Sequence, residues 1–124
     1  MPRPLHVDDV RSVVLPEPTP KPGATAGDPR ESLLQLSDDG RVQIGIWECT
    51  PGSFPSARDG YSEFMLFLAG EATITDDDGT RHRIGPGTAM RVPDGWLGSW
   101  EIRDTVRKVY VGVQTDPSNS SVPD

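Results

Sequence analysis

Residues 63–70, EFMLFLAG, and residues 87–100, GTAMRVPDGWLGSW, decide the fold of this chain. In the first stretch, a single carboxylate opens an apolar run that ends at Gly70. In the second, Gly87 and Pro93 enclose another short run. Runs of this length, bounded by glycine and proline, are typical of strands joined by tight turns. Both stretches therefore predict β-structure.

The same pattern extends in both directions along the chain. Between Leu33 and Val113, turn residues recur about every eight to twelve positions, and no segment keeps the 3.6-residue period of a helix. Asp78-Gly79 suits a tight hairpin, because both residues tolerate positive φ. This pattern predicts an all-β sandwich or barrel. The expected strands are residues 41–50, 62–69, 71–75, 80–84, 88–92, 97–102 and 106–113.

The two ends of the chain differ in composition from this middle part, residues 33–113. Seven of the 13 prolines precede residue 30, so residues 1–32 are expected to form an extended arm over the surface. Within this arm, residues 10–15 (VRSVVL) predict an edge strand laid on the barrel or on a neighbouring subunit. Residues 114–124 are polar and are expected to form a flexible tail.

Length and charge exclude several classes of protein. A chain of 124 residues has room for one domain. The formal net charge of −7 argues against nucleic acid and anionic membranes as partners, since both require clustered Lys and Arg. No apolar run approaches the roughly 20 residues of a membrane span, and the first ten residues lack the apolar core of a signal peptide. The single cysteine, Cys49, is expected to be a buried apolar residue. A cytoplasmic protein is therefore expected.

The spacing of glycine, proline and glutamate resembles the two motifs of the cupin superfamily. These motifs read G-x5-H-x-H-x(3,4)-E-x6-G and G-x5-P-x-G-x2-H-x3-N. The resemblance implies a double-stranded β-helix, the jelly-roll barrel of cupins. The residues that match the motifs are Glu63, Gly70, Gly87, Pro93 and Gly95.

A narrower resemblance comes from the flanking segments. Residues 45–48 (GIWE), Pro51-Gly52 and residues 107–110 (RKVY) are similar to the small single-domain cupins of the ureidoglycine aminohydrolase-like branch. This resemblance covers roughly residues 40–113. It implies chemistry on a small amino or ureido compound, which in that branch depends on a metal site.

The metal ligands of the cupin motifs are missing from this chain. Residues 58–60 (RDG) stand where the family has its histidine pair, and Gly98 stands at the position of the later histidine. A catalytic metal generally takes three or more ligands from His, Cys, Asp and Glu. The two histidines, His6 and His82, lie outside the motifs. No metal and no other cofactor is therefore expected.

The period of a strand places alternate side chains of residues 62–69 on opposite faces. Glu63 and the other odd-numbered residues share the face that the cupin pattern turns inward. Phe64, Leu66 and Leu68 share the other face, which is also apolar and needs a cover. A two-fold partner would supply that cover, so a homodimer is expected.

The inward-facing residues indicate a candidate site at the barrel mouth. A buried carboxylate needs a partner, and Lys108 on the last strand is the expected one for Glu63. These two are the candidate catalytic residues, because burial and pairing suit either to proton transfer. Gly98 is expected to leave open space for a ligand. The expected ligand-binding residues are Trp47, Arg58, Tyr61, Met65, Trp96, Trp100 and Tyr110.

Several of these residues also have purely structural interpretations. The tryptophans can be core residues, Lys108 can face solvent, and Arg58 can be a solvated loop charge. His82, between two arginines, and the acidic turn at residues 76–78 are both interpreted as solvated.

Three classes of function remain open at this point. The first is a small-molecule-binding protein without metal, in which the barrel orients a polar ligand beside Glu63. The second is an enzyme that acts by general acid–base chemistry on a small amino, ureido or sugar-derived metabolite. The third is an interaction protein with a filled barrel. A cavity separates the first two classes from the third.

Overall fold

The computed structural model describes residues 2–115. Within these residues, all of the regular secondary structure is β-strand, and there is no helix. This agrees with the absence of helical periodicity in the sequence. The strands are β1 (Thr19–Pro20), β2 (Ala26–Gly27), β3 (Arg30–Asp38), β4 (Val42–Cys49), β5 (Gly52–Ala57), β6 (Tyr61–Asp76), β7 (Arg81–Ile84), β8 (Ala89–Val92) and β9 (Leu97–Gln114).

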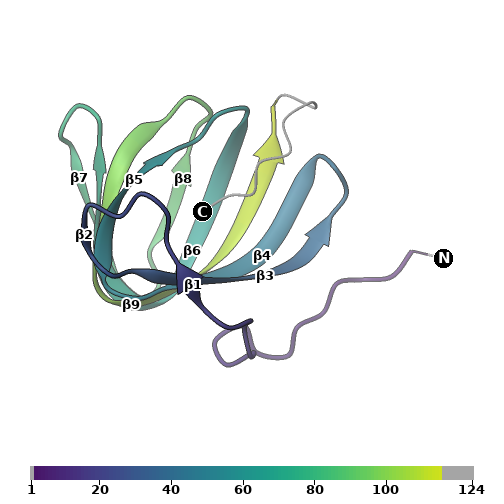
Figure 1. Ribbon diagram of the computed structural model, residues 1–124. Coiled ribbons are helices and arrows are strands. Elements are labelled where there is room, and N and C mark those ends of the chain that lie inside the picture. Colours follow the sequence, from purple (N-terminus) through teal and green to yellow (C-terminus); the bar gives the residue numbers. More distant parts are fainter. Residues whose placement is uncertain (1, 116–124) are drawn as a thin grey trace.

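Two long antiparallel strands, β6 and β9, hold the barrel together. Their pairing runs from Tyr61 opposite Gln114 to Asp76 opposite Gly98. The first half of β6 also pairs with β8 and its second half with β7. The first half of β9 pairs with β5 and its second half with β4. Both strands therefore pass from one side of the barrel to the other, and the sheet curls around one interior (Figure 1). The predicted all-β jelly-roll barrel is confirmed.

The sequence predicted β6 and β9 as two strands each, whereas the structure joins each pair. In β6 the expected break is a bend, with register shifts between Phe67 and Ala72 and a φ of +90° at Gly70. A Cβ at Gly70 would overlap the carbonyl of Thr105 on β9, so only glycine fits there. The glycine that predicts a turn thus marks the corner where the strand changes sheet.

Four strands, β1, β2, β3 and β5, were not among the predicted ones. β5 contains Pro55 in its middle, although proline has no N–H for a ladder. β5 pairs with β9 along its whole length, but β2 pairs only with Gly52 and Ser53. Pro55 therefore stands on an edge, where a missing donor is tolerated.

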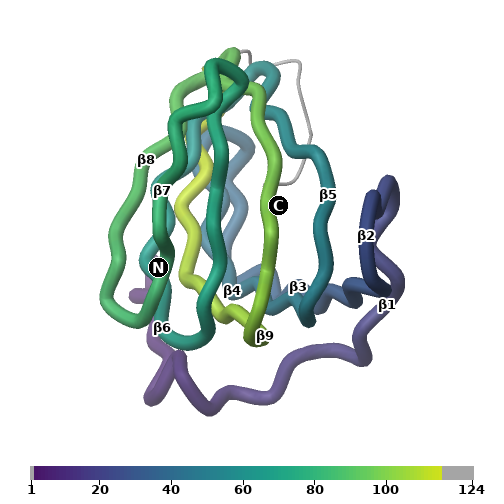
Figure 2. The backbone as a smooth tube through the Cα atoms, turned by 90° about the vertical axis from the view of Figure 1, so that its left-hand side faces the viewer, coloured from purple at the N-terminus to yellow at the C-terminus, as the bar shows by residue number. Residues whose placement is uncertain are grey.

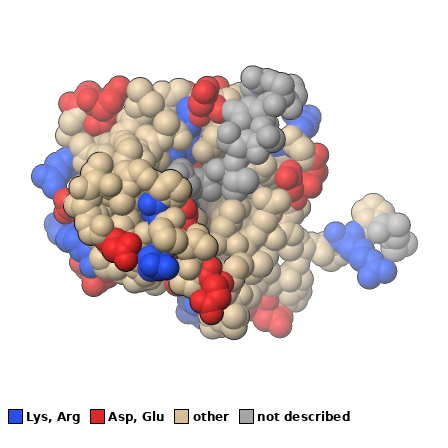
Figure 3. Space-filling model, viewed as in Figure 1, with Lys and Arg blue, Asp and Glu red and all other residues tan. Residues whose placement is uncertain are grey.

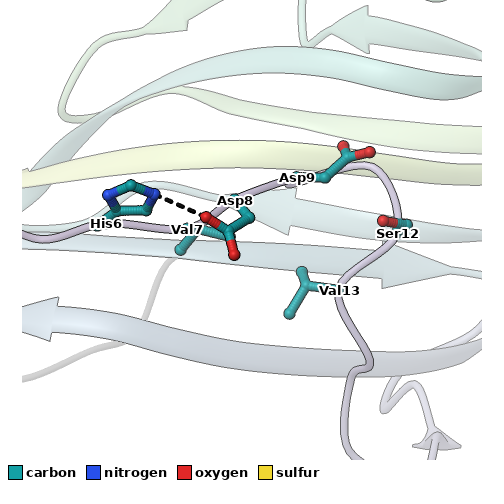
Figure 4. A pocket seen from close by; sticks show the side chains of 6 residues that line it. All are labelled: His6, Val7, Asp8, Asp9, Ser12 and Val13. Carbon is teal, nitrogen blue, oxygen red and sulfur yellow. Dashed lines mark hydrogen bonds and ion pairs between the residues drawn. The ribbon is translucent and has the colours of Figure 1, made fainter.

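The predicted edge strand at residues 10–15 is wrong. Asp9 organises a turn there: its carbonyl accepts the N–H of Val13 at 3.1 Å, and its Oδ1 accepts the N–H of Arg11 at 2.9 Å. Aspartate commonly forms such local bonds, which compete with a strand. Figure 4 shows this turn in front of the sheet, together with His6, whose Nε2 lies 2.8 Å from Asp8 Oδ1.

The arm nevertheless contacts the barrel. Arg107 of β9 donates through Nη1 to the carbonyls of Val10 and Val13, and its Nε donates to Glu48 of β4. Further along, the proline-rich segment adds β1 to the edge of β3 and β2 to the edge of β5. The arm therefore covers the edges of the barrel on the flank between β3 and β5.

The tail prediction for residues 114–124 falls largely outside the described residues. Gln114 is the last residue of β9, and the N–H of Thr115 donates to the carbonyl of Gly60 at 2.8 Å. These two residues are therefore ordered parts of the barrel, and residues 116–124 are not described.

The interior is lined by large aromatic and aliphatic side chains from β4, β5, β6 and β9. Trp100 lies at its centre, stacked on Phe54 with ring centroids 5.9 Å apart and edge-on to Trp47 at 5.3 Å. Cys49 is buried in the same cluster, as predicted. Aromatic contacts of this geometry add about 0.5–1.5 kcal/mol each beyond the area that they bury.

The surface carries charges of both signs. On the face seen in Figure 3, acidic and basic side chains are scattered among uncharged residues. Among the described residues, no helix has the length and apolar character needed to cross a membrane.

Candidate functional site

Glu63 is the centre of the buried polar cluster, in the inward register that the sequence predicts. Its side chain is inaccessible to solvent, and both carboxylate oxygens accept strong hydrogen bonds. Lys108 Nζ donates to Oε2 at 2.7 Å, and Arg58 Nε donates to Oε1 at 2.8 Å. The predicted pair of Glu63 with Lys108 is confirmed, and its role in function stays a prediction.

Lys108 projects inward from the second half of β9 and is completely buried, so its solvent-facing alternative is wrong. Its ammonium group lies 4.7 Å from the ring centroid of Trp47 and 5.0 Å from that of Trp100. It also lies 3.3 Å from the sulfur of Met65. Aromatic faces stabilise a cation, most strongly where water is excluded. The Lys108 side chain therefore ends between a carboxylate and two indole rings.

Arg58 is buried as well, which contradicts its interpretation as a solvated loop charge. The tight turn through Gly60, at a φ of +88°, folds the end of β5 back onto the start of β6. This turn brings Arg58 beside Glu63, five residues away in the chain. Its Nη1 donates to Ser56 Oγ at 2.6 Å and to the carbonyl of Ala57 at 3.1 Å. Planar guanidinium groups are suited to such fixed, multiple bonds.

Two buried donors in the same interior have no acceptor among residues 2–115. They are the indole N–H of Trp100 and the hydroxyl of Tyr110. Burial raises the pKa of Tyr110 to about 12, with a smaller contribution from the negative charge of Glu63. The phenol therefore stays protonated at neutral pH and remains a donor. Tyr110 fits its place because Gly45 lies opposite, where a Cβ would overlap the phenol ring.

Trp47 connects the cluster to a second ion pair that the sequence did not indicate. Its indole N–H donates to Glu31 Oε1 at 3.0 Å, and Lys21 Nζ lies 3.5 Å from the same oxygen. Lys21 also lies over the ring of Phe54 at 5.0 Å. Lys21 belongs to the arm and Glu31 to β3. The irregular sequence pattern of these segments gave no signal of an inward-facing charge.

Tyr61 and Trp96 both contact Arg58. The guanidinium carbon lies 6.0 Å from the Tyr61 ring and 5.6 Å from the Trp96 ring. The predicted open space at Gly98 is wrong, because the indole of Trp96 fills it: a Cβ on Gly98 would overlap that ring. The structure thus places all nine predicted residues around one interior, with Trp96 and Tyr61 at its Arg58 end.

Trp96 in turn contacts the acidic turn that the sequence analysis treated as solvated. Its indole N–H donates to Asp76 Oδ1 at 2.8 Å, and His82 Nε2 lies 2.9 Å from Asp76 Oδ2. The hydrogen bonds from His82 and from Trp96 lower the pKa of the Asp76 carboxyl below its usual value. Asp76 is therefore a specific partner of both Trp96 and His82.

The metal that cupins commonly hold does not fit this site. Both oxygens of Glu63, the remaining motif ligand, are bonded to the cationic groups of Arg58 and Lys108. These positive charges would repel a divalent ion placed beside them. Within residues 2–115, no group of three or more His, Cys, Asp and Glu side chains is placed to hold a metal ion.

The sequence of residues 36–110 matches the model of the EutQ-like cupin domain. The chain therefore belongs to the EutQ-like cupin family, which confirms the expected superfamily. A search of the curated proteins finds none with significant similarity to it.

Several solved structures have a fold similar to that of this chain. The EutQ protein of Clostridium difficile has a TM-score of 0.63 and 21% identity, over 71% of each chain. A protein with unknown function from Pseudomonas syringae pv. tomato has a TM-score of 0.71 and 21% identity, over 85% of this chain and 46% of that one. A predicted oxalate decarboxylase from Thermotoga maritima has a TM-score of 0.59 and 18% identity, over 82% and 99%. At these identities the likeness shows the fold alone.

Proposed function

We propose that the protein binds a small carboxylate-bearing metabolite inside the barrel, beside Glu63 and Lys108 and without a metal. The observation that carries this proposal is the pair of buried donors on Trp100 and Tyr110, which have no acceptor among residues 2–115. A buried polar group left unpaired costs about 1–3 kcal/mol. A ligand oxygen would remove that cost, so the interior is suited to a molecule rich in acceptors.

The neighbouring charges favour a carboxylate as the acceptor group. Lys108 and Arg58 lie on the two sides of Glu63, and the indole ring of Trp100 lies 5.0 Å from the lysine. Positive groups stabilise an anion most strongly where water is excluded. The side chains around them are buried, which meets that condition.

The finer expectation, an activity of the ureidoglycine aminohydrolase-like branch, has less support. That chemistry depends on a metal, and this site does not fit one. Glu63 and Lys108 are the groups that would move a proton in any reaction here, because both lie in the proposed binding region. Binding is therefore the function that we propose, with acid–base catalysis as its extension.

Thermal unfolding in the presence of small anions tests this proposal. Acetate and oxalate are expected to raise the melting temperature, because a ligand bound to the folded state alone stabilises it. Their uncharged counterparts, acetamide and oxamide, are expected to have little effect. Trp100→Phe removes the indole N–H and keeps an aromatic ring, and it is expected to abolish the response to the anions. Arg83→Gln, an exposed cation on β7, serves as the matched control and is expected to keep it.

Native mass spectrometry of protein purified from its own host gives a second readout. A retained small acid, lost in Trp100→Phe, would support the proposal. Equal stabilisation by acetate and acetamide, together with a spectrum of the bare chain only, would contradict it.

A second candidate is an interaction role in which the outer face of the barrel binds another protein chain. Phe64, Leu66 and Val113 are 45%, 38% and 40% exposed, and they lie on the paired strands β6 and β9. The outward orientation of Phe64 and Leu66 is as predicted. Exposed apolar clusters of this kind favour a contact with a second copy of the chain, which is the homodimer that we expect.

Sedimentation velocity checks this second candidate. The protein is expected to sediment as a dimer at micromolar concentration, and Leu66→Lys is expected to give a monomer, because it places a charge in the apolar contact. Val14→Lys, at an even more exposed apolar residue of the arm, is the control and should leave the dimer intact. A wild-type monomer at these concentrations would rule the contact out.

A further inference from the structure

The proposed binding region is closed in this structure. Glu63, Lys108 and Arg58 are all at most 1% exposed. A ligand can therefore reach them only after part of the barrel wall moves. If the proposed function holds, this movement has a definite place in the barrel wall.

One flank of the barrel is closed by the arm. Residues 19–27 pair with β3 and with β5, and Lys21 lies between Glu31 and the ring of Phe54. The N–H of Thr50 also donates to the carbonyl of Arg30 at 2.9 Å. Opening this flank would break several backbone and ionic contacts at once.

The opposite flank is held less firmly. Within the described chain, β7 and β8 each pair with β6 and not with one another. Figure 2 looks onto the flank where these two short strands lie. A hollow of about 320 Å³ opens there, which is within the size range of sites for small ligands. Its lining residues are Asp76, His82, Met90, Arg91, Val92, Pro93 and Trp96.

Trp96 separates this hollow from the buried cluster. It lines the hollow, and its ring lies 5.6 Å from the guanidinium carbon of Arg58. Its backbone is fixed, since the N–H of Arg58 donates to the Trp96 carbonyl at 2.9 Å and the N–H of Gly95 donates to the Arg58 carbonyl at 2.8 Å. The indole packs beside Gly98 and Arg58, and its N–H is tied by the hydrogen bond to Asp76, so the ring can turn out of this position while the backbone of the loop stays in place.

The charges around the hollow suit an anionic ligand. Arg91 is exposed at its rim, and Arg58 lies behind the Trp96 ring. The carboxylate of Asp76 is already bonded to the indole of Trp96 and to His82. A negatively charged molecule would therefore meet a guanidinium group both outside and inside the indole.

We infer that the hollow between β7 and β8 is the entry site for the carboxylate ligand, and that the Trp96 side chain opens and closes it. Asp76 is the positioning residue that holds the indole closed. His82 supports Asp76 from the other side. The sequence predicted Trp96 as a ligand contact and indicated no role for Asp76, His82 or Arg91.

Quenching of tryptophan fluorescence by iodide tests the entry site without a known ligand. In both variants, Trp96→Phe and Trp96→Ala, the tryptophan fluorescence comes from the same two buried residues, Trp47 and Trp100. The phenyl ring fills most of the opening, whereas alanine leaves it open. The iodide quenching constant is expected to be about threefold higher in Trp96→Ala, because its reporters become accessible through a local opening. Caesium, a cation of similar use as a quencher, is expected to show a smaller difference.

A matched control separates an opening from general loosening of the barrel. Leu97→Ala in the Trp96→Phe background truncates the next, exposed residue and is expected to leave quenching unchanged. Equal iodide quenching in the alanine and phenylalanine variants would overturn the inference. An equal rise for iodide and caesium would also overturn it, since that result indicates loss of packing and no anion route.

The proposed function and the entry site fail in different experiments. If iodide reaches the indoles in Trp96→Ala while acetate and oxalate leave the wild-type melting temperature unchanged, the route stands and carboxylate binding fails. If the anions stabilise the wild type and iodide does not distinguish the two variants, binding stands and the route lies elsewhere.

Discussion

Replacing Glu63 by Gln is expected to lower the free energy of unfolding by about 3–5 kcal/mol, because it leaves two buried cations without their shared carboxylate. The side chain keeps its shape, so the loss comes from charge. For a domain of this size, the change corresponds to a fall in melting temperature of about 10–20 °C. Chemical and thermal unfolding measure it directly.

The control for Glu63→Gln is a glutamate-to-glutamine substitution at a surface residue, Glu101. Glu101 lies 3.4 Å from Arg103 Nη1 on the outside of β9, and Glu101→Gln is expected to cost no more than about 0.5–1 kcal/mol. Adding Lys108→Met to the Glu63→Gln variant is expected to recover part of the loss, because it removes one unpaired cation. Equal, small losses for Glu63→Gln and Glu101→Gln would show that the buried pair contributes little.

Gly98→Ala is expected to destabilise the barrel by about 1–3 kcal/mol, because the added methyl group has no room. It would overlap the carbonyl of Thr75 on β6 as well as the Trp96 ring. The carbonyl belongs to a paired strand and cannot yield without breaking the β6–β9 register. The indole would be displaced, so the near-ultraviolet circular dichroism of Trp96 is expected to change along with the stability.

Gly85→Ala provides the comparison for this variant. Gly85 follows β7, and a Cβ there would meet no atom within 4 Å. The substitution is expected to change stability by about 0.5 kcal/mol or less, or to stabilise slightly by restricting the unfolded chain. A Gly98→Ala protein as stable as Gly85→Ala, with an unchanged tryptophan signal, would mean that Trp96 does not occupy the space beside Gly98.

The sequence predicted the barrel and the inward face of β6 because both depend on local patterns. Glycine and proline mark the corners, and the two-residue period assigns Glu63 to the interior and Phe64 to the exterior. Its pairing with Lys108 followed from the cost of burying an isolated charge. Each of these inferences needs only residue type and spacing.

The remaining parts of the site depend on how distant segments meet, and no local pattern encodes that. Trp96 fills the place beside Gly98 only because the turn before β9 folds back over Arg58. Asp76 and His82 look solvated in isolation, yet the indole of Trp96 gives Asp76 a specific partner. The edge strand at residues 10–15 was wrong because the Asp9 carboxylate bonds locally and favours a turn.

The shared strands β6 and β9 have a consequence for how the protein folds. Among the described residues, β7 and β8 each pair with β6. β4 and β5 pair with β9, which in turn pairs with β6. The register between them brings together the region of Tyr61 and that of Gln114, far apart in the chain. Such non-local pairing slows folding into the range of about milliseconds to seconds, because a long loop must close before the β6–β9 contacts form. The barrel is therefore expected to form late and cooperatively, with little stable structure before β9 emerges from the ribosome.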